Sequence, residues 1–131
     1  MRLLESTGRS TGVMNLLIVE DNDQMRRMIV RLVRGLAEHT YECSDGVEAL
    51  PAYTIHRPDW VLMDVKMKEM DGISATKQIK ASYPEANIMI VTDYDDPDLR
   101  EAARSAGARE YVTKENLLDV RRILGSRITR A

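Results

Sequence analysis

The chain has 131 residues, of which 44% are hydrophobic and 31% are charged, and its formal net charge is −2. This length suits one domain with an apolar core. No apolar run approaches the roughly 20 residues of a spanning helix, so we expect no membrane contact. The net charge gives no reason to expect direct contact with nucleic acid. The single cysteine, Cys43, rules out an internal disulfide and is typical of a reducing compartment, so we expect a cytoplasmic protein.

The chain divides into a central domain and two short ends. Residues 1–14 are rich in Ser, Thr, Gly and Arg without periodicity, which predicts a flexible N-terminal tail. In one interpretation Met14 is the natural start, and the residues before it are a vector remnant or an alternative start. The predicted domain covers residues 15–126, and residues 127–131 form a C-terminal tail or the start of a linker.

The first strand–helix unit begins with the apolar run NLLIV at 15–19, which predicts a buried strand. The acidic and amide residues at 21–23 are good helix caps. Apolar residues then recur at helical spacing, and they predict a helix that continues to Leu36: Met25, Met28, Ile29, Leu32 and Leu36.

Two further units occupy the middle of the chain. The segments 40–44, 60–63 and 87–91 predict strands, and 46–56 and 73–83 predict helices. Pro51 lies inside the first of these helices. Because proline lacks an N–H and crowds the carbonyl four residues before it, we expect a kink or a short helix there.

The fourth helix has the clearest predicted ends, with Asp96 as its cap, Pro97 in its first turn and Gly107 at its stop. Its predicted apolar face contains Leu99, Ala102, Ala103 and Ala106. Residues 110–113 predict a fifth strand. Asn116 is the predicted cap of a fifth helix, whose inward residues are Leu117, Val120, Leu124 and Ile128.

Five strands therefore alternate with five helices. Apolar strands without clear alternation indicate a parallel sheet that is covered on both faces, and right-handed crossovers make it a doubly wound α/β fold. Ligands of such sheets bind at the carboxyl ends of the strands.

Charged and hydroxyl residues follow four of the predicted strands: Glu20 and Asp21, Asp64, Thr92, and Lys114. Taken singly they have ordinary explanations, as helix caps, turn residues or surface charges. Together they lie at one edge of the predicted sheet. Three converging carboxylates repel one another, and a hard cation such as Mg²⁺ relieves that repulsion.

The same edge could hold a phosphoryl group. Lys114 offers a compact positive charge for phosphoryl oxygens, and Thr92 offers a hydroxyl donor. Asp64 is then the predicted nucleophile, which would form an acyl phosphate. We expect Asp64 to need no neighbouring base, because a carboxylate is ordinarily deprotonated at neutral pH.

Four motifs in this order and spacing resemble the receiver domain of bacterial two-component response regulators: LLIVEDN (16–22), VLMDVKMKEMDG (61–72), IVTDYDD (90–96) and YVTKENL (111–117). The resemblance implies a flavodoxin-like sheet in the order 2-1-3-4-5. It implies that Glu20, Asp21, Asp64 and the backbone carbonyl of Lys66 bind Mg²⁺, and that Asp64 is phosphorylated with the help of Thr92 and Lys114.

The resemblance also implies a switch and its partners. Tyr111 would turn toward the space that Thr92 leaves after phosphorylation. A sensor histidine kinase would be the phosphoryl donor and would dock on the first helix, at Met25, Arg26 or Arg27. Homodimerisation on phosphorylation is open, through helices four and five or helices one and five. No output domain lies in these residues, so the regulator works alone or an output domain was removed.

Three positions depart from the pattern of the family, namely Lys68, Asp93 and Glu115. Of these, Asp93 lies beside Thr92, where a very small residue is usual, and we expect it to slow phosphoryl entry. Two alternative classes stay open. One is a phosphohydrolase of the haloacid-dehalogenase type, which would carry an aspartate at the position of Lys66. The other is a degenerate receiver that serves only for interaction.

Overall fold

Five strands form one parallel sheet in the order β2-β1-β3-β4-β5, which confirms the predicted fold class. The computed structural model describes residues 14–129, without the side chains of 127–129. The strands are β1 (Met14–Val19), β2 (Ala37–Cys43), β3 (Trp60–Met63), β4 (Ile88–Thr92) and β5 (Glu110–Thr113). Strands β3 and β4 are buried along their whole length, as expected for the centre of a doubly covered sheet.

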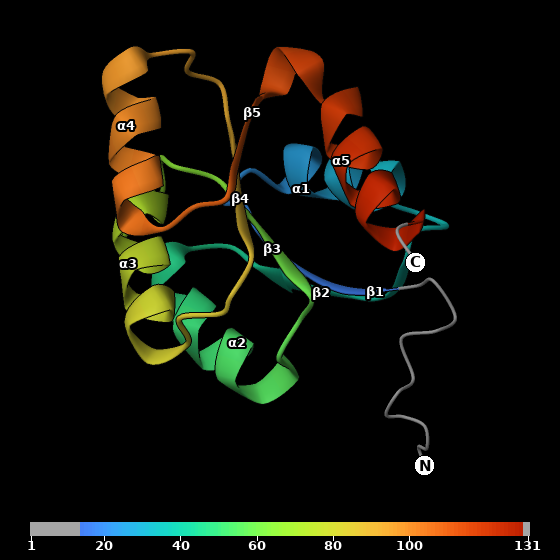
Figure 1. The fold of residues 1–131 in the computed structure, drawn as a ribbon, viewed down its shortest axis with the longest axis horizontal. Coiled ribbons are helices and arrows are strands. Elements are labelled where there is room, and N and C mark those ends of the chain that lie inside the picture. Colours follow the sequence, from blue (N-terminus) through green and yellow to red (C-terminus); the bar gives the residue numbers. More distant parts are fainter. Residues whose placement is uncertain (1–13, 130–131) are drawn as a thin grey trace.

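Helices cover the two faces of the sheet unequally (Figure 1). Helices α1 (Asp23–Leu32) and α5 (Leu118–Thr129) lie on one face, and α2 (Ala49–His56), α3 (Gly72–Ser82) and α4 (Pro97–Ala106) lie on the other. The buried residues accordingly form two clusters. Leu16, Ile18 and Leu62 pack toward α1 and α5, while Leu17 and Val61 pack toward the other three helices. Alternate residues of one strand thus serve opposite layers.

The ends of α4 agree with the sequence prediction. The Asp96 carboxylate accepts a hydrogen bond from the N–H of Asp98 at 3.0 Å, and Pro97 occupies the first turn. Gly107 ends the helix at φ 108°, a left-handed conformation that favours glycine. The predicted apolar face is wrong at one residue, because Ala102 is exposed. The other predicted residues of this face are confirmed, since Leu99 and Ala103 pack in the core and Ala106 is buried.

The first helix is shorter than its apolar periodicity predicts. Helix α1 ends at Leu32, and Gly35 then turns the chain at φ 91°, so that β2 begins at Ala37 rather than at residue 40. Leu36 lies in this connection, although it still packs against the α1–α5 core. Met28 is 44% exposed and is not a core residue, because the helix turns the side chain of Ile29 toward the sheet.

Two other helix starts also differ from the prediction. A 3₁₀ turn at Gly46–Glu48 precedes α2, so Pro51 is the third residue of a short helix. The N–H that Pro51 lacks would fall in the first turn, where no intrahelical acceptor exists. We expected a kink or a short helix, and the structure has the short helix. Asn116 does not cap α5, because its amide donates to the Thr113 hydroxyl at 3.2 Å, and α5 starts at Leu118. The side chain of Ile128 lies outside the described residues.

A long-range contact joins the two helices of the α1–α5 layer. The Arg121 guanidinium on α5 donates to the carbonyl oxygens of Leu32 at 2.9 Å and Arg34 at 3.0 Å. These carbonyls lie at the C-terminal end of α1, where the helix itself supplies no donors. The Arg121 side chain therefore supplies hydrogen-bond donors that the C-terminal end of α1 lacks.

Two expectations from composition can be compared with the described residues. Cys43 is buried and free, and burial raises the pKa of its thiol to about 11, as suits a small apolar core residue. Between residues 14 and 129 no helix combines the length and apolar character needed to cross a membrane. The predicted tail at 1–14 lies outside the described residues except for Met14, which is the first residue of β1.

Candidate functional site

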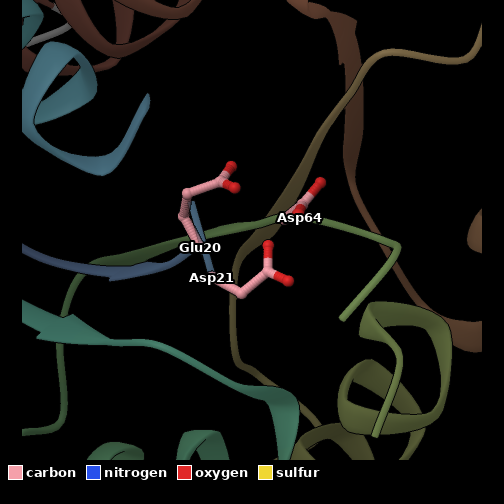
Figure 2. A group of neighbouring side chains, drawn as sticks. All are labelled: Glu20, Asp21 and Asp64. Carbon is pink, nitrogen blue, oxygen red and sulfur yellow. The ribbon is translucent and has the colours of Figure 1, made fainter. Parts of the chain in front are cut away.

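Three carboxylates meet at the carboxyl edge of the central strands (Figure 2). Glu20 and Asp21 follow β1, and Asp64 follows β3, whose residue Met63 pairs with Val19 of β1. The N–H of Asp64 donates to the carbonyl oxygen of Val19 at 2.9 Å, which fixes the two strand ends side by side. One carboxylate oxygen from each acid lies within 4.8 Å of the others. This set of hard oxygen donors fits Mg²⁺.

Helix capping does not explain these acids. Asn22 is the cap of α1, and its side-chain oxygen accepts from the N–H of Met25 at 2.8 Å. Glu20 accepts from the N–H of Asn22 at 3.1 Å through one oxygen, while its side chain is buried. Asp21 caps no helix, and it is the more exposed member of the cluster. The cluster therefore combines two buried acids with one at the solvent edge.

Lys114 neutralises part of this negative charge. Lys114 directly follows β5. Its ammonium lies 2.9 Å from a carboxylate oxygen of Glu20 and 3.2 Å from one of Asp64. Burial by itself would lower the pKa of Lys114, but the two carboxylates outweigh burial and raise it. Lys114 therefore remains a cation inside the site.

Asp64 itself is only 6% exposed, which changes the expectation about its charge. Burial and the neighbouring Glu20 raise the pKa of the Asp64 carboxyl well above its ordinary value, although Lys114 opposes this shift. Burial therefore opposes the ionised form that the sequence analysis expects for Asp64, and the expectation that this carboxylate needs no neighbouring base stays a prediction. Its charge depends on Lys114 and on any cation that the three acids hold.

The hydroxyl residue also lies where the sequence predicts. Thr92 is the last residue of β4, the neighbour of β3, and is fully buried. Thr92 pairs with Thr113 of β5, and Lys114 is the residue that follows Thr113. The hydroxyl oxygen of Thr92 accepts from the N–H of Tyr94 at 3.3 Å. Asp93, between them, is exposed.

The remaining predicted residues lie around this edge. The Tyr111 hydroxyl donates to the carbonyl oxygen of Tyr94 at 2.6 Å, and the Arg100 guanidinium lies 4.4 Å from the centre of its ring. The Lys66 ammonium lies 4.7 Å from the centre of the Tyr94 ring. The switch role of Tyr111 and the metal role of the Lys66 carbonyl stay predictions.

The three residues predicted for kinase docking differ in accessibility. Arg26 pairs with Asp23 at 2.7 Å and with Glu42 at 3.0 Å, and it also donates to the carbonyl oxygen of Glu20 at 2.8 Å. Met25 packs against the α1–α5 core. Arg27 is exposed, so it is the most accessible of the three to a partner.

A buried aspartate that the sequence analysis did not consider holds the loop that follows Asp64. Asp45 accepts hydrogen bonds from the N–H groups of Glu69 at 2.9 Å, Met70 at 3.1 Å and Val47 at 2.9 Å. Burial would raise the pKa of Asp45, but these N–H donors outweigh burial and lower it. The Asp45–Gly46 pair was the available signal, since aspartate often accepts from nearby backbone in turns.

Two glycines let the chain pass close to this loop. A Cβ at Gly72 would overlap the carbonyl oxygen of Asp64, and a Cβ at Gly46 would overlap the carbonyl oxygen of Met70. The N–H of Gly72 also donates to the carbonyl oxygen of Val65 at 2.7 Å. The backbone of the loop at 64–72 is therefore held by close packing as well as by Asp45.

The family whose sequence profile is described as the response regulator receiver domain matches residues 16–124. The chain belongs to this family, whose members act as phosphoacceptor switches.

Two curated relatives illustrate its range. The transcriptional regulatory protein PdtaR of Mycobacterium tuberculosis is 41% identical over 99 residues, which is 75% of this chain and 48% of that protein. The chain thus spans about half the length of that relative. The chemotaxis protein CheY of Bacillus subtilis is 38% identical over 100 residues, which is 76% of this chain and 83% of that protein.

Solved structures share the fold. A LuxR-family two-component response regulator from Aurantimonas sp. SI85-9A1 is 29% identical, with a TM-score of 0.77 over 87% of this chain and 86% of that one. The CheX–CheY–BeF₃–Mg²⁺ complex from Borrelia burgdorferi is 21% identical, with a TM-score of 0.80 over 94% of this chain and all of that one. At that identity the second likeness shows the fold alone.

Proposed function

We propose that Asp64 accepts a phosphoryl group and that this reaction depends on Mg²⁺ held by Glu20, Asp21, Asp64 and the carbonyl of Lys66. One observation supports the proposal most directly. A buried carboxylate lies 3.2 Å from a buried lysine, and two further acids lie within 4.8 Å of it. A structural ion pair needs only one acid, whereas this arrangement has an excess of negative charge that a divalent cation would balance.

The chemistry assigns a role to each residue. An Asp64 oxygen attacks the phosphorus of a phosphorylated histidine, the P–O bond forms, and the P–N bond to the imidazole breaks. Mg²⁺ supplies charge stabilisation for the phosphoryl oxygens when it is bound. Lys114 balances the negative charge of the phosphoryl group, and the Thr92 hydroxyl donates to one of its oxygens. The resulting aspartyl phosphate is lost later to water.

Phosphorylation then has to change a surface. The phosphoryl oxygens draw Thr92 and Lys114 toward Asp64, and Tyr111 moves in response. Because Tyr111 lies beside α4, this biases the α4–β5 face between two arrangements. A sensor histidine kinase is the proposed partner, and it would dock at α1. For the whole protein, the proposal also includes dimerisation on phosphorylation and control of an output domain.

The experiment is phosphorylation of the purified protein by acetyl phosphate with Mg²⁺, followed by intact-mass measurement. We expect a single labile phosphoryl group on the wild type, and none on Asp64→Asn, which keeps the shape but loses the nucleophile. Asp93→Asn is the matched control at an exposed aspartate of the same edge, and it should still be phosphorylated once. A labile phosphoryl group on Asp64→Asn would show that another residue is the acceptor.

The same preparation tests the phosphohydrolase alternative. The position two residues after Asp64 holds Lys66 and not the second aspartate that such enzymes use. We therefore expect no multiple turnover of a small phosphoester such as p-nitrophenyl phosphate, and sustained turnover would favour the enzyme.

A further inference from the structure

The chain bends between β1 and α1, and this bend brings two neighbouring acids to one site. Successive side chains of an extended strand point to opposite faces of the sheet. Glu20 and Asp21 nevertheless both place a carboxylate oxygen within 4.8 Å of one from Asp64 (Figure 2). The bend lies at Asp21, two residues after the end of β1. The geometry of the proposed metal site therefore depends on what holds the backbone at these two acids.

The Arg26 guanidinium on α1 holds this bend through all three of its nitrogens. Nη1 donates to the carbonyl oxygen of Glu20 at 2.8 Å. Nη2 donates to the carboxylate of Asp23 in the first turn of α1 at 2.7 Å, and Nε donates to the carboxylate of Glu42 on β2 at 3.0 Å. One planar group thus joins the end of β1, the start of α1 and the edge strand β2.

The exposure of these groups indicates that the contact serves geometry more than stability. The Arg26 side chain is 16% exposed, whereas the side chains of Asp23 and Glu42 are 68% and 45% exposed. Ion pairs with such exposed carboxylates contribute little to folding. They do fix the plane of the guanidinium, and this plane determines where the group meets the Glu20 carbonyl.

We propose that Arg26 is a positioning residue for the Mg²⁺ site. It holds the bend in the arrangement that turns the carboxylates of Glu20 and Asp21 toward Asp64. The inference rests on the proposed function and deepens it. Arg26 acts through the backbone of Glu20, and its guanidinium is already engaged by three acceptors of this chain. It therefore differs in role from the exposed Arg27 beside it.

Geometry and charge have opposite effects at this position, so the substitution has to separate them. A positive charge near a cation site opposes Mg²⁺ binding, although Asp23 and Glu42 offset the charge of Arg26. Arg26→Lys keeps the charge, but a single ammonium cannot reach three acceptors as a planar guanidinium does. Groups that orient metal ligands typically change metal affinity about 10- to 100-fold. Since Arg26 acts only through the backbone, we expect Arg26→Lys to weaken Mg²⁺ binding by about three- to tenfold.

The test is calorimetric titration of the unphosphorylated protein with Mg²⁺ at fixed ionic strength. Arg31→Lys is the matched control, because it makes the same change at an exposed position of the same helix, and its Mg²⁺ affinity should equal that of the wild type. Glu42→Asp keeps the charge on β2 but shortens the side chain, and it should weaken binding by about twofold. The double variant Arg26→Lys/Glu42→Asp should lose less than the product of the two single effects, since both release the same guanidinium.

The Mg²⁺ dependence of phosphorylation by acetyl phosphate separates positioning from general destabilisation. We expect Arg26→Lys to need about three- to tenfold more Mg²⁺ for its half-maximal rate, while its rate at saturating Mg²⁺ stays within about twofold of the wild-type rate. A loss of folded protein would instead lower the maximal rate and leave the half-saturating concentration unchanged. Urea unfolding without Mg²⁺ measures the folded fraction of each variant.

Two results would overturn the inference. One is a folded Arg26→Lys variant that binds Mg²⁺ as tightly as the wild type. The other is a lowered maximal rate at an unchanged half-saturating Mg²⁺ concentration. If Arg26→Lys does not fold, Glu42→Asp decides in the same way, and wild-type affinity in that variant overturns the inference.

The wild type distinguishes this inference from the proposed function. If the wild type binds no Mg²⁺, the metal step of the proposed function falls together with the role of Arg26. If the wild type binds Mg²⁺ and all variants bind it equally, only the role of Arg26 falls.

Discussion

Asp45 should be one of the most sensitive positions outside the acidic cluster. It is 8% exposed and accepts three backbone hydrogen bonds, at 2.9 and 3.1 Å from Glu69 and Met70 of the loop it holds and at 2.9 Å from Val47 of the adjacent 3₁₀ turn. Hydrogen bonds to a charged group contribute about 1.5–3 kcal/mol each when one partner is removed. Since the freed N–H groups can partly rebind water, we expect Asp45→Ala to lower the free energy of unfolding by about 2–4 kcal/mol.

Asp45→Asn should cost less, about 1–2 kcal/mol, because its single carbonyl oxygen still accepts while its amide faces N–H donors. The loop at 64–72 carries Lys66, so both variants should also weaken Mg²⁺ binding and slow phosphorylation by acetyl phosphate. Asp71→Asn is the matched control, since Asp71 is an exposed cap of α3 at the end of the same loop. Asparagine is as good a cap as aspartate, so this control should change stability little.

The pH dependence of Asp45 supplies an independent check. Its folded pKa is lowered, so its contribution to stability is present above the unfolded pKa of about 4 and is lost as the pH falls through the folded pKa. The stability difference between wild type and Asp45→Asn, measured by urea unfolding, should be full at pH 7 and should shrink below about pH 4. A difference under about 0.5 kcal/mol at pH 7 would refute the structural role assigned to this carboxylate.

The other predictions concern the acidic cluster, its backbone and its partner. Asp21→Ala should abolish the calorimetric signal of Mg²⁺ binding, and an unchanged affinity would remove Asp21 from the metal site. In metal-free protein, Asp64→Asn should raise the melting temperature more at pH 8 than at pH 5. The reason is that the folded pKa of Asp64 is raised, so the wild-type fold loses stability as the pH rises toward that pKa. An equal gain at both pH values would contradict the assigned cause. Gly72→Ala should slow phosphorylation and destabilise the fold by about 1–3 kcal/mol, since its Cβ would overlap the Asp64 carbonyl, and wild-type behaviour in urea unfolding would count against that packing. Arg27→Glu should slow transfer from the cognate kinase more than phosphorylation by acetyl phosphate, whereas equal slowing would indicate a defect in the site.

The features that the sequence predicted well depend on short stretches of chain. Strands β1, β3 and β4 are mainly apolar runs, and the cap and stop of α4 are local. Parallel strands bring Asp64 and Lys114 to one edge whatever the packing between the helices is. The end of α1 was missed because Leu36 continues the helical spacing, whereas the helix ends at Leu32 and Gly35 then turns the chain. Periodicity alone does not decide between these two signals.

The residues that were missed act through contacts between distant segments. Asp45 lies in the connection after β2 and binds the loop after β3, so neither segment alone reveals the contact. Arg26 was predicted only as a docking residue, and the folded structure shows that its side chain reaches the Glu20 carbonyl and Glu42 on β2. The raised pKa of Asp64 likewise depends on how deeply the strand ends are buried. Spacing along the chain contains none of this information.

The Arg121 contact has a consequence for the order in which the chain folds. It joins residues that are 87 and 89 positions apart, so the loop it closes is nearly as long as the domain. Contacts of such separation carry a large closure entropy and form late. During synthesis, the carbonyls of Leu32 and Arg34 lack the Arg121 donor until α5 has emerged and docked. The N-terminal half therefore acquires its full complement of hydrogen bonds only when the last helix is in place, and a chain cut before residue 121 leaves its first helix unfinished.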